Sequence, residues 1–409
     1  AVAYDLTGDG KTNLHGSYGI FHDATLGAIT GVTQILTGTQ TGVRTLVVSL
    51  AQSCGGVPCP VLAWNSPGRQ IASEQLASTL LGGFYPTAVF AADPALETPY
   101  AHQAAFGVDR ALADNLALNV NAVFVRGYQQ VGTIDYNPTL TARLGPSRRP
   151  NDLPCSVNPA APCVNGAIPG TSASVLQYTS FGETEYKGLT VSLNKRFSNR
   201  YQFLAAYTLS KAEDNSTDFQ SNFIPQNNGF GRNPSDQSGL PLGFNPDSEF
   251  GPATHDQRHR FVFSGVYQLP MNIGVSAILT ATSGRPFTPL AGADLNADGN
   301  GGAFPPDRAR TNPADESTSV GRNSETTVGF LGLDLRVSKR FRFGQRGSIE
   351  ALMDVFNLFN RVNFFENTNQ SSFTIFGAGA YPASPLPTYG KYTETLPPRQ
   401  VQLAAKISF

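Results

Sequence analysis

The chain has 409 residues, of which 14% are charged, against roughly 25% in ordinary soluble domains. Its 29 Lys and Arg nearly balance 30 Asp and Glu, so the net charge of −1 lacks the basic surplus typical of nucleic-acid binders. With 27 Phe and 14 Tyr the chain is too aromatic for a disordered protein. It also lacks the run of about 20 apolar residues that a membrane-spanning helix needs. This composition favours many strands joined by long polar loops.

Alternation of apolar and polar residues recurs along the chain and predicts about eleven strands. One clear example is the stretch in which Leu189, Val191 and Leu193 alternate with polar residues. Helical spacing is absent from these segments. The expected strands begin near these residues: Ala1, Thr12, Pro99, Leu116, Glu185, Tyr201, Arg260, Ile273, Thr327, Ser348 and Arg399.

The connections between these strands alternate strictly between short and long. The short ones are Thr7–Lys11, Leu112–Asn115, Ser198–Arg200, Pro270–Asn272 and Gly344–Gly347. The long ones are Asp23–Thr98, Gln129–Thr184, Ala212–His259, Gly284–Thr326 and Arg361–Pro398. Outer-membrane barrels place short periplasmic turns at one end and long extracellular loops at the other. The expected fold class is all-β, an antiparallel up-and-down transmembrane β-barrel segment; a secreted soluble β-sandwich is the weaker alternative.

The two faces of the expected strands differ in chemistry. Leu333, Leu335 and Val337 alternate with Asp334 and Arg336, and the pattern continues through Ser338 and Arg340. A lipid-facing row must be apolar, whereas a wet lumen accepts charges. Lys195 and Lys339 interrupt the apolar rows near strand ends, where a long side chain can snorkel to the membrane interface. Aromatic residues at strand ends match the interfacial girdles of barrels: Tyr18, Tyr128, Phe197, Tyr201, Phe341 and Phe343.

The last segment alternates up to the final residue, Phe409. Apolar Val401, Leu403, Ala405 and Ile407 face one way in this pattern. A terminal aromatic residue on an alternating strand resembles the C-terminal signature by which the barrel assembly machinery reads bacterial outer-membrane proteins. We therefore expect Phe409 to be an assembly signal, although a free terminal strand of a soluble protein could look similar.

Four cysteines fall in two close pairs within Pro- and Gly-rich loops. Cys54 and Cys59 form one pair, and Cys155 and Cys163 form the other. Such pairs predict two local disulfides in an oxidising compartment. For the first pair a zinc half-site is the alternative, but no partnering His or Cys pair supports it.

Oxygen-bearing side chains at alternating positions mark one loop. Asp294, Asn296, Asp298 and Asn300 surround a turn at Gly299, a pattern that suits a hard cation such as calcium. The helix-loop-helix form of such a site would need Glu where Pro305 stands, and Asp307 could supply a carboxylate from farther along. The alternative is a loop rich in Asx turns that holds no ion.

Two other motifs favour plain structural interpretations. Asp5 with Gly10, Lys11 and Thr12 imitates a phosphate-binding loop, but strand-like sequence follows it, so we expect a hairpin turn. The stretch 255–260, with two His, one Asp and two Arg, opens a strand at the loop end. We expect a carboxylate–guanidinium network there rather than a metal or catalytic site.

Four stretches of sequence resemble TonB-dependent outer-membrane receptors of the Oar-like variety: Leu6–Asp23, His255–Pro270, Asp294–Arg310 and Ala351–Phe364. The resemblance spans nearly the whole chain. It implies a 22-stranded barrel whose lumen holds a plug, with residues 1–409 as roughly its C-terminal half. The expected eleven strands are an odd number, whereas single-chain barrels have even counts. No plug domain or TonB box precedes Ala1, so we expect a fragment.

The resemblance implies uptake of an unidentified ligand across the bacterial cell outer membrane. TonB would energise uptake in the full-length protein, through the missing N-terminal part. The alternative is a structural or adhesive surface protein without transport. No catalytic motif appears, so an enzyme is not expected. The expected partners are outer-membrane lipid, the barrel assembly machinery and an extracellular ligand, with no nucleic acid and no cofactor beyond a possible structural calcium ion.

Overall fold

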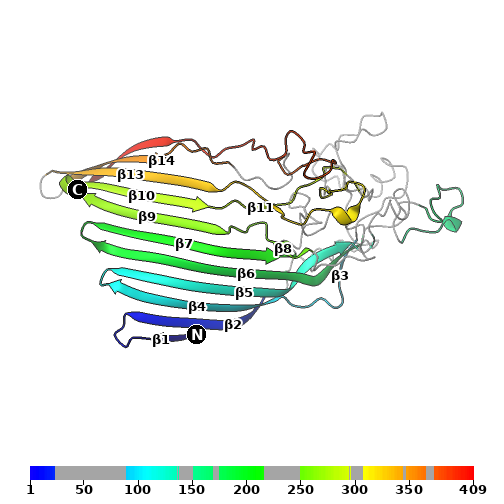
Figure 1. Ribbon diagram of the computed structural model, residues 1–409, viewed down its shortest axis with the longest axis horizontal. Helices are drawn as coiled ribbons and strands as arrows, with labels where there is room; N and C mark the ends of the chain where they lie inside the picture. Colours follow the sequence, from blue (N-terminus) through cyan, green and yellow to red (C-terminus); the bar gives the residue numbers. More distant parts are fainter. Residues whose placement is uncertain are drawn as a thin grey trace, which may run out of the picture.

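The computed structural model describes residues 1–23, 89–135, 137, 151–168, 175–215, 249–293, 295, 307–343, 347–364 and 373–409. These residues form one large sheet, with short turns at one end and loops at the other, and a separate sheet of two short strands (Figure 1). The strands are Val2–Asp5 (β1), Thr12–His22 (β2), Val89–Ala92 (β3), Tyr100–Ala113 (β4), Leu116–Asp135 (β5), Val175–Ser198 (β6), Tyr201–Asp214 (β7), Gly251–Pro252 (β8), His259–Leu269 (β9), Ile273–Thr282 (β10), Pro286–Phe287 (β11), Glu325–Thr326 (β12), Phe330–Phe343 (β13), Gly347–Phe356 (β14) and Gln400–Ser408 (β15). Short 3-10 turns lie at Cys155–Val157 (η1), Pro270–Asn272 (η4) and Glu316–Thr318 (η5). Among these described residues, no helix has the length and apolar character needed to cross a membrane.

Eleven strands follow one another in chain order across the sheet, β1-β2-β4-β5-β6-β7-β9-β10-β13-β14-β15, each antiparallel to the next. Several begin at the predicted residue, including β2 at Thr12 and β10 at Ile273. The predicted all-β, up-and-down fold is therefore confirmed. Within the described residues, β1 pairs only with β2 and β15 only with β14, so both outer edges of the sheet are open.

Local sequence explains the short turns. In the β9–β10 turn, Met271 and Asn272 adopt positive φ angles of 61° and 56°, which reverses the chain within three residues. In the β1–β2 turn, the carboxylate of Asp5 accepts hydrogen bonds from the backbone N–H groups of Thr7 (3.3 Å) and Gly10 (2.8 Å). The segment that imitates a phosphate-binding loop is thus a hairpin turn, as predicted.

The strands β5 and β6 extend well beyond their predicted ends. The sequence predicts a loop from Gln129 to Thr184, but β5 continues to Asp135 and β6 begins at Val175. Their pairing shifts register between Gly127 and Gln130 and again before Gly132. A bulge breaks strict alternation, so a search for period two ends where the extension begins.

The predicted loop Asp23–Thr98 contains a short strand, β3, and in this respect the prediction was wrong. Residues Val89–Ala92 pair parallel to Val175–Tyr178, the loop-end extension of β6. Four residues are too few to show a period, and only the tertiary position of β6 provides the partner. The sheet is therefore antiparallel along its main path with one parallel addition at the loop end.

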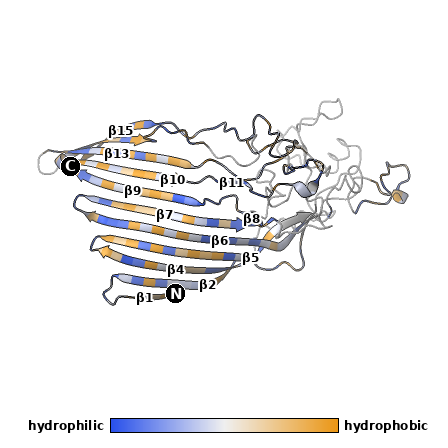
Figure 2. Cartoon of the chain, viewed as in Figure 1, coloured by the Kyte–Doolittle hydropathy of each residue, from blue (hydrophilic) through white to orange (hydrophobic). Residues whose placement is uncertain are grey.

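Cross-strand register separates two faces of the sheet, because residues directly opposite each other point to the same side. One row across eight strands is apolar or aromatic: Leu14, Val108, Val120, Val191, Tyr207, Phe261, Ala281 and Leu331. The adjacent row is largely polar or small: Asn13, Asp109, Asn119, Ser192, Ala206, Val262, Thr280 and Gly332. Figure 2 shows this alternation along the strands. We call the face that carries the apolar row the outward face and the face that carries the polar row the inward face.

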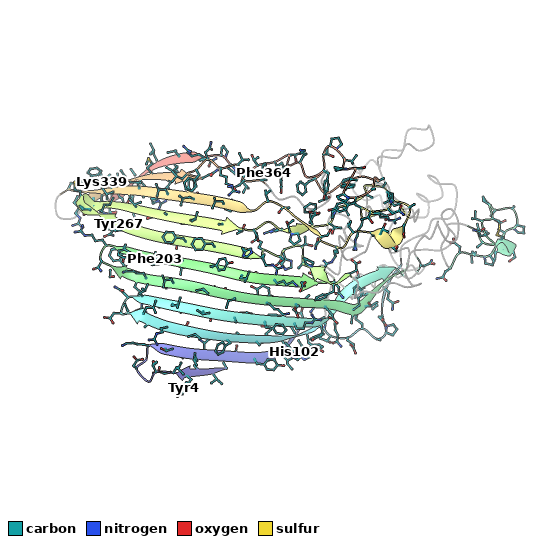
Figure 3. The ribbon with its side chains drawn as sticks, viewed as in Figure 1. Tyr4, His102, Phe203, Tyr267, Lys339 and Phe364 are labelled. Atoms are coloured by element: carbon teal, nitrogen blue, oxygen red, sulfur yellow. A yellow bond between two sulfur atoms is a disulfide. The ribbon has the colours of Figure 1, made fainter. Side chains whose placement is uncertain are left out.

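The two lysines that interrupt the outward face extend towards the short turns, the direction that snorkelling to the interface requires. Lys195 Nζ donates to Ser198 Oγ (2.6 Å) in the β6–β7 turn and lies 4.2 Å from the centroid of the Tyr201 ring. Lys339 Nζ donates to the carbonyl of Met271 (2.6 Å) in the neighbouring turn. Figure 3 places Lys339 at the short-turn end of the strands, where aromatic rings gather. The charges thus lie at the short-turn end of the strands, among aromatic residues of the same face.

Candidate functional site

The inward face carries the candidate path for a ligand. A cavity of about 480 Å³ opens on it, lined by residues of β6, β7, β9 and β10 that include Gln202, Ser264 and Ser276. A second cavity of about 330 Å³ lies between β10, β13 and the chain that precedes β15, next to Asp334. Both cavities combine polar groups with apolar walls, as ligand pockets do.

A polar cluster occupies the inward face of β2, β4 and β5. The two ring nitrogens of His15 lie 3.4 Å from Asp109 Oδ2 and 3.0 Å from Asn121 Oδ1. Asn119 Nδ2 donates to Asp109 Oδ1 (2.6 Å). The cluster fits because residue 107 is Gly: a Cβ there would lie 2.2 Å from both His15 Nε2 and Asn121 Oδ1.

A second group of charges crosses the inward face of β13 and β14. Arg336 donates to both carboxylate oxygens of Asp354, through Nε at 2.5 Å and Nη2 at 2.8 Å. Arg340 Nη2 donates to Glu350 Oε2 at 3.2 Å. In each pair the two residues lie directly opposite each other on the neighbouring strands. The predicted separation of these charges from the apolar row of the same strands is therefore confirmed.

Two of the long connections fold together at the loop end into what we call the loop module, whose described residues are 283–293, 307–329 and 373–398 (Figure 1). Leu290 joins the two by backbone hydrogen bonds, donating to Thr374 O (2.9 Å) and accepting from Phe376 N (2.7 Å). The core is apolar and aromatic. The ring of Phe376 lies 5.0 Å from that of Tyr381 and 5.2 Å from that of Tyr389.

Buried ion pairs attach the loop module to the wall of the sheet. Arg322 pairs with Asp214 at the loop end of β7, and its Nε donates to the carbonyl of Glu249 (3.0 Å). Arg308 Nη1 donates to Glu249 Oε1 (3.0 Å). Asn323 Nδ2 adds a hydrogen bond to the carbonyl of Pro252 in β8 (2.7 Å). A buried charge is stable only when it is paired and hydrogen-bonded, and these contacts provide that.

The interior of the loop module shifts the proton affinities of its groups. Burial raises the pKa of Tyr381 to about 12, and the hydrogen bond that its hydroxyl donates to Glu325 contributes further. Burial also raises the pKa of Tyr389, with a smaller effect from Tyr381. Burial lowers the pKa of Arg322, although Asp214 opposes the shift. The two tyrosines are thus neutral hydrogen-bonding groups at physiological pH.

The 255–260 motif adopts the network that its composition predicts. Asp256 Oδ1 accepts a hydrogen bond from the backbone N–H of Ala212 (2.9 Å), and Asp256 Oδ2 lies 3.4 Å from Arg258 Nη2. The carboxylate therefore fixes the base of the loop between β7 and β9. Among the described residues, no three His, Cys, Asp or Glu side chains gather in a group that could hold a metal ion.

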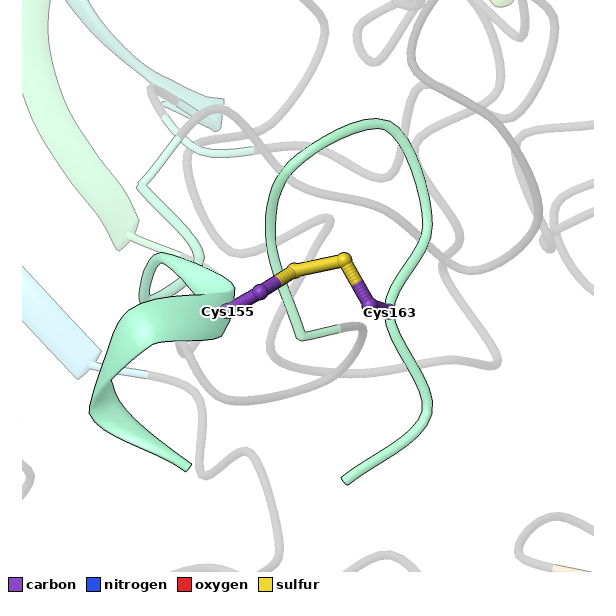
Figure 4. The surroundings of a disulfide bond; sticks show 2 residues. All are labelled: Cys155 and Cys163. Carbon is purple, nitrogen blue, oxygen red and sulfur yellow. A yellow bond between two sulfur atoms is a disulfide. The ribbon is translucent and has the colours of Figure 1, made fainter. Parts of the chain in front are cut away.

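Cys155 and Cys163 form a disulfide that closes a short loop between β5 and β6 (Figure 4). Their Cα atoms are 5.7 Å apart. The other predicted pair, Cys54 and Cys59, lies outside the described residues.

The calcium prediction falls largely outside the described residues, which exclude Asp294, Asn296, Asp298 and Asn300. Asp307 is described and deeply buried. Its Oδ2 accepts from the backbone N–H of Leu295 (2.6 Å) and lies 3.6 Å from Arg310 Nη2. The carboxylate thus already has a structural role in closing this loop, and the calcium site stays a prediction.

Sequence reasoning did not identify the groups that hold the loop module together. Arg308 and Arg322 lie in segments predicted as plain loop, and their partners Asp214 and Glu249 lie far away in the sequence. The four arginines of the connection Gly284–Thr326, in an otherwise charge-poor chain, were the available signal. The His15 cluster was also missed, because its members alternate along three separate strands.

Comparison with known proteins agrees with this architecture. The family model described as "Outer membrane beta barrel domain" matches residues 1–402. The outer membrane transporter YddB from Escherichia coli has a similar structure, with a TM-score of 0.52 and 10% identity over 100% of this chain and 40% of that chain. A mutant of the ferric enterobactin receptor PfeA from Pseudomonas aeruginosa matches with a TM-score of 0.45 and 12% identity, over 100% of this chain and 39% of that chain. The ferric-catecholate import receptor Fiu from E. coli matches with a TM-score of 0.43 and 14% identity, over 100% of this chain and 34% of that chain.

The chain spans less than half the length of the solved structures it matches. No curated protein matches its sequence. The likeness to YddB concerns the fold alone, since identity is low. The family model, which covers nearly the whole chain, agrees with the strand path, the apolar outward face and the separation of turns from loops. The chain belongs to the outer membrane beta barrel domain family and lies in the bacterial outer membrane.

Proposed function

We propose that the chain forms part of the wall and the extracellular mouth of a TonB-dependent transporter that takes up a ligand across the outer membrane. The observation that carries the proposal is the inward face. The Arg336–Asp354 pair crosses it at the level of Leu335 and Val337, which lie on the apolar outward face of the same strand. Charges at that depth are stable where they line a wet lumen.

The open edges of the sheet bear on how the barrel closes. An edge strand leaves a row of backbone N–H and C=O groups unpaired, and each such group costs several kcal/mol in hydrocarbon. In our proposal, further strands of the full-length protein cover β1 and β15 and complete a larger barrel. A plug and a TonB-contacting segment of that protein would couple uptake to the inner membrane.

The loop module fits the role of a fixed entrance rather than a mobile lid. Its aromatic core and its buried pairs with Asp214 and Glu249 attach it to the wall. The cavity beside Asp334 lies where the chain before β15 meets the inward face. A ligand that passes the module would reach this cavity next.

The test is depletion of small molecules from spent medium of the native host, measured by mass spectrometry after incubation with cells that express the full-length protein. We expect one or more compounds to be depleted in cells with TonB and not in matched cells without it. A variant with Arg336→Gln and Arg340→Gln should deplete them more slowly at equal surface amounts. Equal depletion with and without TonB would contradict energised uptake. No depletion in either strain, with firm attachment to surfaces, would support an adhesive protein.

A further inference from the structure

The outward face changes character towards the loop end of the strands. On β6 the outward residues between Lys187 and Lys195 are Leu189, Val191 and Leu193. At ~3.3 Å per residue the two lysines are about 26 Å apart along the strand. The apolar band of outer-membrane barrels is about 25 Å tall. Because the strands of such barrels are tilted by roughly 35–45°, this separation corresponds to about 19–22 Å of membrane height. With Lys195 at the periplasmic border, Lys187 lies just inside the outer border, which its long side chain can reach.

Two lysines face each other at this border. Lys187 lies directly opposite Lys211 of β7, a pairing of like charges that is unfavourable in itself. Each ammonium contacts a glutamate of its own strand, Lys187 with Glu185 at 2.5 Å and Lys211 with Glu213 at 2.6 Å. The glutamate side chains are each only 16% exposed, whereas those of Lys187 and Lys211 are 58% and 43% exposed. Arg126 pairs with Glu183 and Glu185, so the three cations of this cluster are balanced by three glutamates, and the most exposed charged groups are the two ammoniums.

A shelf of rings continues the same outward face across β5, β4 and β2. The rings of Tyr100 and Tyr128 stack with centroids 5.3 Å apart, and His102 meets Tyr128 edge-on at 5.9 Å. The hydroxyl of Tyr18 lies 2.6 Å from His102 Nδ1. Arg126 lies 5.4 Å above the Tyr128 ring, between the shelf and the lysines. Figure 3 shows His102 at the loop end, away from Lys339.

We propose that this outward patch, made of Lys187 and Lys211 with the rings of Tyr18, His102 and Tyr128, binds the phosphorylated sugar headgroup of a glycolipid in the outer leaflet. The paired ammoniums have donors left for a phosphate, and their positive charge complements it. The ring of Tyr18 is exposed and those of His102 and Tyr128 are half-buried, and their uncovered parts offer flat apolar surfaces against which the C–H groups of a sugar pack. Because the patch faces lipid, this site is separate from the inward path proposed for a transported ligand.

The experiment uses the full-length protein extracted from outer membranes in mild detergent and stripped of lipid. It is titrated with bis-phosphorylated lipid A and, in parallel, with the dephosphorylated lipid. Changing Lys187→Gln together with Lys211→Gln should weaken binding of the phosphorylated lipid by about twenty-five-fold, at about five-fold for each lysine. Binding of the dephosphorylated lipid should not change. The variant with Arg at both positions should bind like the parent.

Lys339→Gln is the matched control, because it removes a lysine from the same outward face at the periplasmic end. It should bind the phosphorylated lipid like the parent. Heat-modifiable gel migration checks that each variant is folded, and the two single Lys→Gln variants serve if the double variant does not assemble. Unchanged affinity in the Gln variants, or equal affinity of the parent for both lipids, would overturn the proposal. If inorganic phosphate displaced the bound lipid as effectively as free lipid does, the site would recognise phosphate and not the glycolipid headgroup. Self-association of the protein through this face without lipid would point to a second copy of the chain as the partner.

Discussion

Arg322 of the loop module and Asp214 at the end of β7 form an ion pair in which both side chains are buried. The two residues are far apart in sequence, yet this pair joins an extracellular connection to the barrel wall. Arg322 also contacts the carbonyls of Glu249 and Gly251, so one guanidinium joins the loop module to two segments, the end of β7 and residues 249–251. The position of the loop module therefore depends on a few buried charges as well as on its aromatic core.

Replacing Arg322 by Met should detach the loop module from the wall. It leaves Asp214 buried without its guanidinium, a change that costs about 3–5 kcal/mol in comparable buried pairs. We expect protease to cut residues 307–329 at least about a hundred-fold faster on intact cells. Arg399→Met, which changes an exposed arginine, is the control. Combining R322M with Asp214→Leu should restore part of the resistance, and unaltered cleavage of R322M would show that the aromatic core alone positions the module.

Alkaline pH should loosen the loop module through Tyr381. Its pKa is raised to about 12, mainly by burial, so the folded module binds the hydroxyl proton more tightly than the unfolded chain. The resulting stability is fully present below about pH 10, the ordinary tyrosine pKa, and is lost as the pH rises through about 12. Because burial also raises the pKa of Tyr389, the ultraviolet absorbance of tyrosinate should show more than one late-titrating tyrosine. Tyr381→Phe should reduce the amplitude of this late titration by one residue, and Glu325→Gln should shift one of its components to lower pH. Tyr4→Phe, at an exposed tyrosine, should leave the late titration in place.

Gly107→Ala should disrupt the polar cluster on the inward face. The new Cβ would overlap His15 Nε2 and Asn121 Oδ1, both 2.2 Å away, at a cost of about 1–3 kcal/mol. Gly16→Ala on the adjacent strand is the control, since its Cβ would meet atoms no closer than 3.7 Å. The temperature at which the barrel loses its heat-modifiable gel migration measures the effect. Equal temperatures for the two variants would argue against a tightly packed cluster.

The disulfides can be read directly from peptides released without reduction. Mass spectrometry should find Cys155 linked to Cys163 and, by the sequence-based prediction, Cys54 linked to Cys59. For a loop as short as 155–163 the chain-entropy estimate is about 2–3 kcal/mol of local stability. Ser in place of both Cys155 and Cys163 should therefore increase cleavage within residues 151–168, with little effect elsewhere. Free thiols at either pair in the outer-membrane protein would refute that pairing.

Deletion of Phe409 should reduce assembly in the outer membrane while leaving export from the cytoplasm intact. The side chain is 97% exposed and follows β15, so its loss removes little packing from the sheet. A strong defect would therefore reflect recognition rather than stability. Surface labelling and heat-modifiable migration provide the measurement, and Phe409→Tyr, which keeps an aromatic terminus, should assemble normally. Normal surface display of the deletion would count against an assembly signal.

Most of the wall could be predicted because it follows from local rules. Alternation marks strands such as β7 and β13, and Met271 and Asn272 lie where the chain must turn tightly. Both signals depend on residues close together in the sequence. The prediction ended at the bulges near Gly127, where an extra residue changes which side chains face the lumen. The parallel strand β3 was missed because its partner, the extended end of β6, is known only from the fold.

The amino-acid sequence by itself determined which residues face lipid and which face the lumen, and where the chain turns back, because these properties repeat with the two-residue period of a strand. Only the tertiary structure decided which residues meet across strands and loops. The pairs Arg322–Asp214 and Lys187–Lys211 and the cluster of His15 with Asn121 all join segments distant in sequence. Their energies depend on burial and on the distance between specific atoms. Alternation along a single strand carries no information about either.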